Sequence, residues 1–232
     1  MALFKPGPFA STVRGKTANM VLAQTESGIV IRDHVIPKNP RTAAQVDLRE
    51  DFAKATRTWE TLSAARVINW NNYGEDQTRR TKAGKVRTKN GFNVFTGLAT
   101  KFLQVTPGGN IPLDPPTAPF SGDSVTLTAT AGTGKITFTA DKANAAGVTT
   151  EFLFQRLRNL SRRPQSAYKT LAFNTFTSGS LSKDVTIPTG FYAVGYRFVK
   201  TSTGQESPMT RLPLQTVQFA VEDGSTQRKK AA

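Results

Sequence analysis

A proline-rich segment near the middle of the chain constrains the fold more than any other feature. Five of the 13 prolines lie between Pro107 and Pro119. Proline fixes φ and lacks a backbone N–H, so neither a helix nor a central strand can run through this segment. Apolar residues recur at helical spacing before it and alternate in short runs after it. We therefore predict that residues 106–119 connect two domains of different class.

The beginning of the chain has the pattern of an arm followed by a β-hairpin. Residues 17–24 and 29–36 alternate between apolar and polar side chains, and a short turn that ends in Gly28 separates them. Residues 1–11 are predicted to form an extended arm. Lys5, Pro6 and Pro8 interrupt the apolar run that a signal peptide requires, and no stretch of about 18 apolar residues predicts a membrane span.

The strongest periodic signal in the sequence follows the hairpin. Apolar residues there are spaced by four, three, four and three, which places them on one face of a helix. They are Leu48, Phe52, Ala55, Trp59 and Leu62.

Capping residues mark where the helices of this region begin. Thr42 and Gln45 form a capping box after Arg41, and Ser63 is placed to cap a second helix that contains Trp70. Gly74 is the predicted end of that second helix.

A third helix is predicted to end near Gln104 and to pack on Trp59 and Trp70. Gly91 and Gly97 lower the helix propensity of this segment. Together these patterns predict an α+β domain at residues 12–105, made of the hairpin and about three helices.

The region after the connector is predicted to be an all-β sandwich at residues 120–222. Short runs rich in Val, Thr, Phe and Tyr are separated there by Gly, Pro, Asn or Ser. The seven predicted strands are 124–130, 135–140, 149–157, 167–173, 180–187, 191–200 and 214–221. Residues 223–232 lack periodicity and are predicted to be a basic flexible tail.

Two parts of the chain resemble known modules. The spaced pattern NPRT…Q…R…W…LS…W, which begins at Asn39, resembles a module of poorly characterised bacterial and phage-encoded structural proteins. That resemblance implies fold-specifying rather than catalytic roles; the residues concerned are Arg41, Thr42, Gln45, Trp59, Ser63 and Trp70. The sequence PPTAP at residues 115–119, with GFYAVGYRF at 190–198, resembles a fibronectin type III or immunoglobulin-like sandwich.

Residue types used in catalysis are scarce. The chain has one histidine, His34, and no cysteine, so most parts of a Ser-His or Cys-His arrangement are missing. The nearest cluster of oxygen ligands is Asp47, Glu50 and Asp51. A simpler interpretation than a metal site is that these negative charges stabilise the N-terminal half of their own helix. We expect no enzymatic activity, no metal and no cofactor.

The excess of basic residues is the most informative remaining feature. With 31 Lys and Arg against 16 Asp and Glu, the net charge is +15. One group forms a predicted basic loop; its members are Arg79, Arg80, Lys82, Lys85, Arg87 and Lys89. A second group comprises Arg156, Arg158, Arg162, Arg163 and Lys169, and the tail contains a third at 228–230. Such charge attracts nucleic acid or acidic protein, and it also simply aids solubility.

The leading hypothesis is a virion component, in a phage capsid or tail, whose partners are copies of itself or other structural subunits. The alternative is a nucleic-acid-binding protein that contacts the phosphate backbone through its helical domain. Part of that domain, Trp59 to Ser63 followed by Trp70, also resembles part of an HMG-box domain. A third, carbohydrate-binding interpretation requires exposed aromatic residues, whereas Phe152 and Phe198 lie at predicted core positions. A cytoplasmic or cell-surface location stays open.

Overall fold

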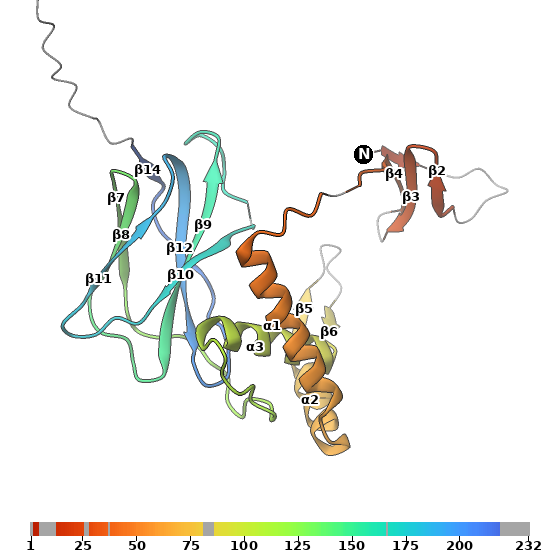
Figure 1. Ribbon diagram of the computed structural model, residues 1–232, viewed down its shortest axis with the longest axis horizontal. Coiled ribbons are helices and arrows are strands. Elements are labelled where there is room, and N and C mark those ends of the chain that lie inside the picture. The colour runs from red at the N-terminus through yellow and green to blue at the C-terminus, as the bar shows by residue number, and fades with distance from the viewer. Residues whose placement is uncertain are drawn as a thin grey trace, which may run out of the picture. The chain divides into compact units, whose positions relative to one another are not determined.

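The computed structural model describes residues 2–4, 13–25, 28–36, 38–80, 86–165 and 167–218 of the chain (Figure 1). For residues 2–4 and 79–80 only the backbone is described. The chain divides into two compact units, residues 1–43 and 44–232. Within the described residues, three helices and several antiparallel sheets form a mixed α+β fold, as predicted.

The N-terminal unit contains a four-stranded antiparallel sheet. Its strands β1 (Ala2–Phe4), β2 (Gly15–Thr17), β3 (Met20–Thr25) and β4 (Gly28–Asp33) lie in the order β1-β4-β3-β2. Among the described side chains of this unit, only Ile29 is buried. The described sheet is therefore a single layer, whereas stable domains usually pack two layers around a core.

This sheet is larger than the predicted hairpin. The predicted strand 17–24 is interrupted, because Ala18 has a φ of 47° and a turn at Ala18 and Asn19 reverses the chain between β2 and β3. The second strand ends at Asp33 rather than at residue 36, and the backbone N–H of His34 then donates to the Asn19 carbonyl at 2.6 Å. Part of the predicted arm, residues 2–4, is strand β1, and residues 5–11 lie outside the described residues.

The second unit begins with the helical region, which comprises α1 (Ala43–Glu60), α2 (Ala64–Asp76) and α3 (Gly91–Val105). Between α2 and α3, strands β5 (Thr78–Arg80) and β6 (Val86–Thr88) pair antiparallel. The two ends of the predicted basic loop are therefore paired strands of a β-hairpin. Residues 81–85, between them, lie outside the described residues. None of the helices in the described part of the chain is long and apolar enough to cross a membrane.

Gly74 lies inside α2, contrary to the prediction that it ends the helix. A Cβ atom there would lie 2.7 Å from the carbonyl oxygen of Lys89, and a Cβ atom on Gly91 would lie 2.7 Å from the backbone nitrogen of Asn71. Both glycines therefore allow α2 to approach the segment that begins α3. Close approach of two backbones, rather than helix termination, explains the glycine at position 74.

The tryptophans pack on α3 as predicted. The rings of Trp59 and Trp70 lie 5.4 Å and 5.1 Å from the ring of Phe95. The apolar stripe of α1 is only partly covered, however, because α3 packs on the second half of α1. Leu48 and Phe52, in the first half, are 46% and 52% exposed.

The proline-rich connector is non-helical, as predicted, but it packs against the helices instead of separating two domains. The indole Nε1 of Trp70 donates to the Leu113 carbonyl at 3.0 Å, and Ile111 is buried in the helical core. At its other end, the side-chain amide of Gln205 donates to the Ala118 carbonyl at 3.0 Å. These contacts explain why the division into compact units differs from the predicted domains 12–105 and 120–222.

The two-sheet region follows the connector. One sheet has the order β11-β8-β7, and the other has the order β10-β9-β12-β13, with β14 also paired to β12. The strands are β7 (Leu127–Gly132), β8 (Lys135–Ala140), β9 (Val148–Leu157), β10 (Lys169–Asn174), β11 (Ser182–Thr186), β12 (Gly190–Lys200), β13 (Thr210–Arg211) and β14 (Gln215–Val217). Seven of them correspond to the predicted strands. The two-residue β13 was missed because it is too short to show alternation.

Side chains from both sheets share one hydrophobic core. Phe138 of β8 stacks on Phe152 of β9 with ring centroids 4.1 Å apart, so the two sheets meet face to face. At the start of β12, the buried Tyr192 donates its hydroxyl to the carbonyl oxygen of Pro188 at 2.7 Å. This bond fixes the corner by which the chain passes from β11 to β12.

Candidate interaction surfaces

A buried ion network connects the helical region to the two-sheet region. The carboxylate of Glu151 on β9 is fully buried and accepts from Lys101 Nζ at 2.9 Å, Arg197 Nε at 2.7 Å and the Thr170 hydroxyl. Glu206 pairs with the same two cations, at 3.1 Å from Lys101 and 2.6 Å from Arg197. The four charges balance, so the network joins α3 to β9 and β12 without leaving an unpaired buried charge.

The surroundings of Glu151 favour its ionised form. Burial alone would raise its pKa, but the hydrogen bond from Arg197, the charge of Lys101 and the hydrogen bond from Thr170 together hold the pKa below its ordinary value. The sequence analysis did not single out this network. A glutamate inside a run of buried strand residues was the signal that could have found it.

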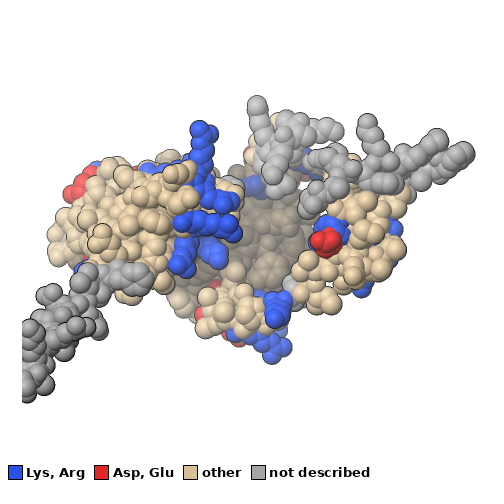
Figure 2. Space-filling model, turned by 90° about the horizontal axis from the view of Figure 1, so that it is seen from above, with Lys and Arg blue, Asp and Glu red and all other residues tan. Residues whose placement is uncertain are grey.

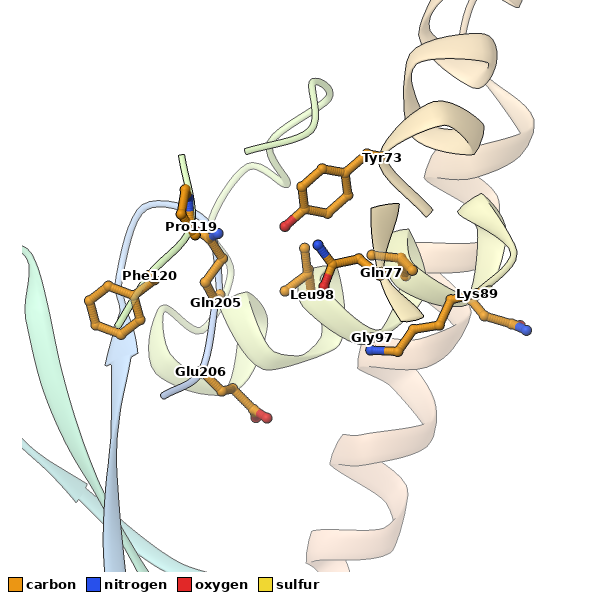
Figure 3. A pocket seen from close by; sticks show the side chains of 12 residues that line it. Tyr73, Gln77, Lys89, Gly97, Leu98, Pro119, Phe120, Gln205 and Glu206 are labelled. Carbon is orange, nitrogen blue, oxygen red and sulfur yellow. The ribbon is translucent and has the colours of Figure 1, made fainter. Parts of the chain in front are cut away.

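An open groove of about 490 Å³ lies between the helical region and the two-sheet region (Figure 3). Tyr73 of α2 and Gln77, which follows α2, line one side, Gln205 and Glu206 line the other, and Leu98 of α3 lies between them. The lining mixes amide, phenol and carboxylate groups with a few apolar side chains. Among the described residues that line it, Glu206 is the one carboxylate, and it pairs with Lys101 and Arg197.

A second groove, of about 290 Å³, lies between α1 and α3. Phe52 lines it from α1, and Asn93, Thr96, Thr100 and Gln104 are among the residues that line it from α3. Thr100 Oγ1 and Gln104 Oε1 are buried and have no hydrogen-bond partner in the described part of the chain. Buried oxygen atoms without partners are costly in a folded protein.

The acidic side chains Asp47, Glu50 and Asp51 lie on α1. Partial burial and the neighbouring charge of Asp47 raise the pKa of Asp51, against a smaller opposite effect of Lys54. The ammonium of Lys54 donates to the Gly109 carbonyl at 2.9 Å. No group of three or more potential metal ligands occurs among the residues that the structure describes.

The predicted basic residues are divided between two places. Arg79 and Arg87 are opposite each other in the β5–β6 hairpin, and Lys89 lines the groove of Figure 3. Nothing is described of the side chains of Arg79 and Arg80, and Lys82 and Lys85 lie outside the described residues, as does the basic part of the tail.

The other group gathers at the C-terminal end of β9. We call it the β9 basic cluster, and it comprises Arg156, Arg158, Arg162, Arg163 and Lys169. Figure 2 looks down on this end of the two-sheet region and shows Lys and Arg side chains grouped there without an acid among them. A hollow of about 480 Å³ adjoins the cluster, lined by Arg156, Leu157, Arg158, Gly190 and Phe191.

The residues predicted to specify the fold have different surroundings. Trp59 and Trp70 belong to the helical core. Arg41, Thr42 and Gln45 are exposed, and Thr42 directly precedes the first residue of α1, at the expected cap position. Ser63 occupies the N-cap of α2 without a side-chain cap hydrogen bond.

Glycine and aspartate shape the loops of the two-sheet region. The GTGK sequence at 132–135 forms the connection between β7 and β8, with Gly134 at a φ of 66°. Asp123 accepts from the backbone nitrogens of Ser124 and Ala145, and Asp141 accepts from that of Thr126. These carboxylates tie loops to the sheet.

No protein-family model matches the chain, and no curated protein matches it. One similar solved structure is a family 76 glycoside hydrolase from a bovine Bacteroides thetaiotaomicron strain, with 12% identity and a TM-score of 0.31; the match covers 42% of this chain and 20% of that one. Another is the fibronectin type-III domain of human fibronectin type III domain containing protein 3, with 12% identity and a TM-score of 0.25, covering 47% of this chain and all of that one. Likenesses at this level assign neither fold nor function to this chain.

Proposed function

We propose that this chain is a non-enzymatic structural protein of a virion, a phage capsid or tail component that assembles with copies of itself or with other structural subunits. The partner surface in this proposal is the first half of α1 together with the groove between α1 and α3.

The exposed apolar side chains of α1 carry the proposal. Val46, Leu48 and Phe52 are 36%, 46% and 52% exposed. Fully burying a side chain of this kind contributes about 1.5–3 kcal/mol, so a surface that covered Leu48 and Phe52 would gain a substantial part of the binding free energy. Phe52 also borders the groove between α1 and α3, whose lining includes Thr100 and Gln104.

The N-terminal sheet supports the same proposal. Its described part is one layer with one buried side chain, Ile29. A sheet of this size gains little stability by itself, and a second layer from a partner subunit would complete its core.

We also propose that the two-sheet region is a fibronectin type III or immunoglobulin-like sandwich. Its antiparallel sheets share one core, and successive strands change sheets between β8 and β9 and again between β10, β11 and β12. The bond from the Tyr192 hydroxyl to the Pro188 carbonyl has the form of a tyrosine corner, which in such sandwiches lies near the start of a late strand. Sandwiches of this class serve widely as structural modules, which is compatible with an assembly role.

Light scattering coupled to size-exclusion chromatography tests the assembly role. We expect defined oligomers of the full chain whose population rises with protein concentration. The double variant Leu48→Ser/Phe52→Ser should be monomeric with an unchanged far-UV CD spectrum, because both side chains are exposed. A matched control is Ile68→Ser, which removes an apolar side chain on α2 that is 58% exposed. A wild-type chain that stays monomeric at every concentration and does not associate with other structural subunits would contradict the proposal.

A further inference from the structure

We propose that the hollow beside the β9 basic cluster binds single-stranded nucleic acid, with phosphates on the arginines and a base against Phe191. This site is separate from the α1 surface, and the inference does not depend on the assembly role. The sequence-based alternative placed nucleic-acid binding in the helical domain, and it also named Arg156, Arg158, Arg162 and Arg163 as candidate contacts of an anionic partner.

The cluster has cations that the rest of the protein does not neutralise. Within the described part of the chain, none of its five members forms an ion pair. Arg158, Arg162, Arg163 and Lys169 are exposed, and the segment from 156 to 169 contains no Asp or Glu. Elsewhere the partly buried cations Lys101 and Arg197 each contact two carboxylates. Five unpaired cations of the described two-sheet region therefore lie near the C-terminal end of β9.

The loop after β9 carries three of the five members, Arg158, Arg162 and Arg163, and hydrogen bonds connect its described residues to β9 and to one another. The backbone nitrogen of Gln165 donates to the side-chain oxygen of Gln155 at 2.8 Å, which ties the loop to β9. The backbone nitrogen of Arg162 donates to the Asn159 carbonyl, which closes a turn. Arg156 itself donates to the Thr189 carbonyl at 3.4 Å. A fixed backbone lowers the entropy lost when a ligand binds.

The chemistry of the lining favours a nucleic-acid strand over an acidic peptide. Arginine presents a planar fork of donors that matches phosphate oxygens. Arg156 and Arg158 border a hollow that also contains Leu157 and the partly exposed ring of Phe191. An acidic peptide would use the charges but not the aromatic ring, whereas an unpaired base can stack on it.

Fluorescence anisotropy with the full chain tests this site. The probes are labelled oligothymidylate and oligouridylate of about 20 nucleotides, and a duplex of the same length, each titrated over a range of salt concentrations. Each phosphate contact in a single strand contributes about 0.7 to the slope of log K against log salt. The triple variant Arg158→Gln/Arg162→Gln/Arg163→Gln should therefore lower the slope by about 2 and weaken binding roughly 100-fold at about 0.1 M salt.

A matched control removes the same charge from elsewhere. Lys142, Lys183 and Arg211 are exposed and have no ion-pair partner in the described part of the chain, so the variant Lys142→Gln/Lys183→Gln/Arg211→Gln should keep most of the affinity. The conservative variant Phe191→Leu should weaken single-strand binding by about tenfold without changing the salt slope.

Three results would overturn the inference. The first is a wild-type chain that binds neither single strand, and the second is an equal loss of affinity in the two triple variants, which would indicate general charge attraction. The third is displacement of the strand by polyglutamate as readily as by unlabelled strand, which would identify an acidic protein as the partner. A preference for the duplex over both single strands would contradict the stacking role of Phe191.

Discussion

The ammonium group of Lys101 lies 2.9 Å from the carboxylate of Glu151, and this contact joins helix α3 to strand β9. The two residues are 50 positions apart in the sequence and lie on opposite sides of the proline-rich connector. Arg197 and Glu206 complete the network. The helical region and the two-sheet region therefore share a buried electrostatic joint, which the domain pattern of the sequence does not reveal.

Removing the buried carboxylate should destabilise the protein strongly. Glu151→Gln leaves Lys101 and Arg197 with only Glu206, and breaking a buried ion pair from one side typically costs about 3–5 kcal/mol. We expect a decrease of about 3 kcal/mol in the free energy of unfolding, measured by urea denaturation. The control is Asp184→Asn in the pair with Lys135, whose side chains are 50% and 47% exposed. Exposed pairs contribute little, so a control as destabilised as Glu151→Gln would contradict the assignment.

The same network predicts acid sensitivity. Glu151 has a pKa lower in the folded chain than in the unfolded one, where it is about 4.3. Its contribution to stability is therefore fully present above about pH 4.3 and is lost as the pH falls through the folded pKa. The difference in unfolding free energy between wild type and Glu151→Gln should shrink as the pH falls below about 4.3.

Asp51 provides the contrast, because its pKa is raised in the folded chain. Ionisation of Asp51 opposes folding. The contribution of Asp51 to stability is therefore most favourable below the pKa that it has in the unfolded chain, and it is lost as the pH rises through the pKa that it has in the folded chain. Relative to wild type, Asp51→Asn should gain stability as the pH rises from about 3 to about 6. A loss of stability in Asp51→Asn over this range would show that the burial and the charge of Asp47 do not dominate there.

Two glycines of α3 should respond oppositely to alanine. Gly91 has no room for a Cβ, which would lie 2.7 Å from backbone atoms of α2, whereas Gly97 has nothing within 4 Å. Overpacking typically costs about 1–3 kcal/mol, while Gly to Ala in a helix adds about 0.5–1 kcal/mol. Thermal denaturation should therefore show a lower Tm for Gly91→Ala and a higher Tm for Gly97→Ala. Equal shifts would mean that α2 does not press on Gly91.

Gly204 tests the packing of a sheet loop on α3. It has a φ of 73°, and a Cβ there would lie 2.2 Å from the Leu98 carbonyl. Gly147 has a similar φ of 74°, but its nearest neighbour would be 3.8 Å away. Gly147→Ala should cost only about 1–2 kcal/mol for the left-handed backbone, and Gly204→Ala should cost clearly more. The difference between the two variants in urea denaturation isolates the contact with α3, and equal costs would argue against that contact.

Local patterns in the sequence predicted most of the elements. The alternating runs after the connector predicted seven strands, and the helical spacing around Trp59 predicted where α1 and α3 would meet. These predictions succeeded because periodicity follows directly from strand and helix geometry. The turn at Ala18 and Asn19 was missed because alternation continues through it, and β13 was missed because two residues show no period.

The candidate surfaces depended on contacts between distant segments. The sequence identified the basic residues but not which of them pair with carboxylates. In the structure Arg197 pairs with Glu151 and Glu206, whereas Arg158 and Arg162 have no ion pair among the described residues. The sequence identified the stripe from Leu48 to Leu62, but the position of α3 decided which half of that stripe is covered. From the sequence, Gly74 could not be distinguished from a glycine that ends a helix. The close approach of Lys89 to Gly74 involves a distant segment and produces no pattern in the neighbouring residues.

The sequence alone therefore determined the element types, the α+β class and the strong positive charge, since each follows from local composition and spacing. Tertiary structure decided that the connector and helices pack with the two sheets as one unit, that Glu151 is buried between them, and which charged and apolar side chains stay exposed. Burial and ion pairing depend on residues that are far apart in the chain, and the spacing of neighbouring residues carries no information about such distances.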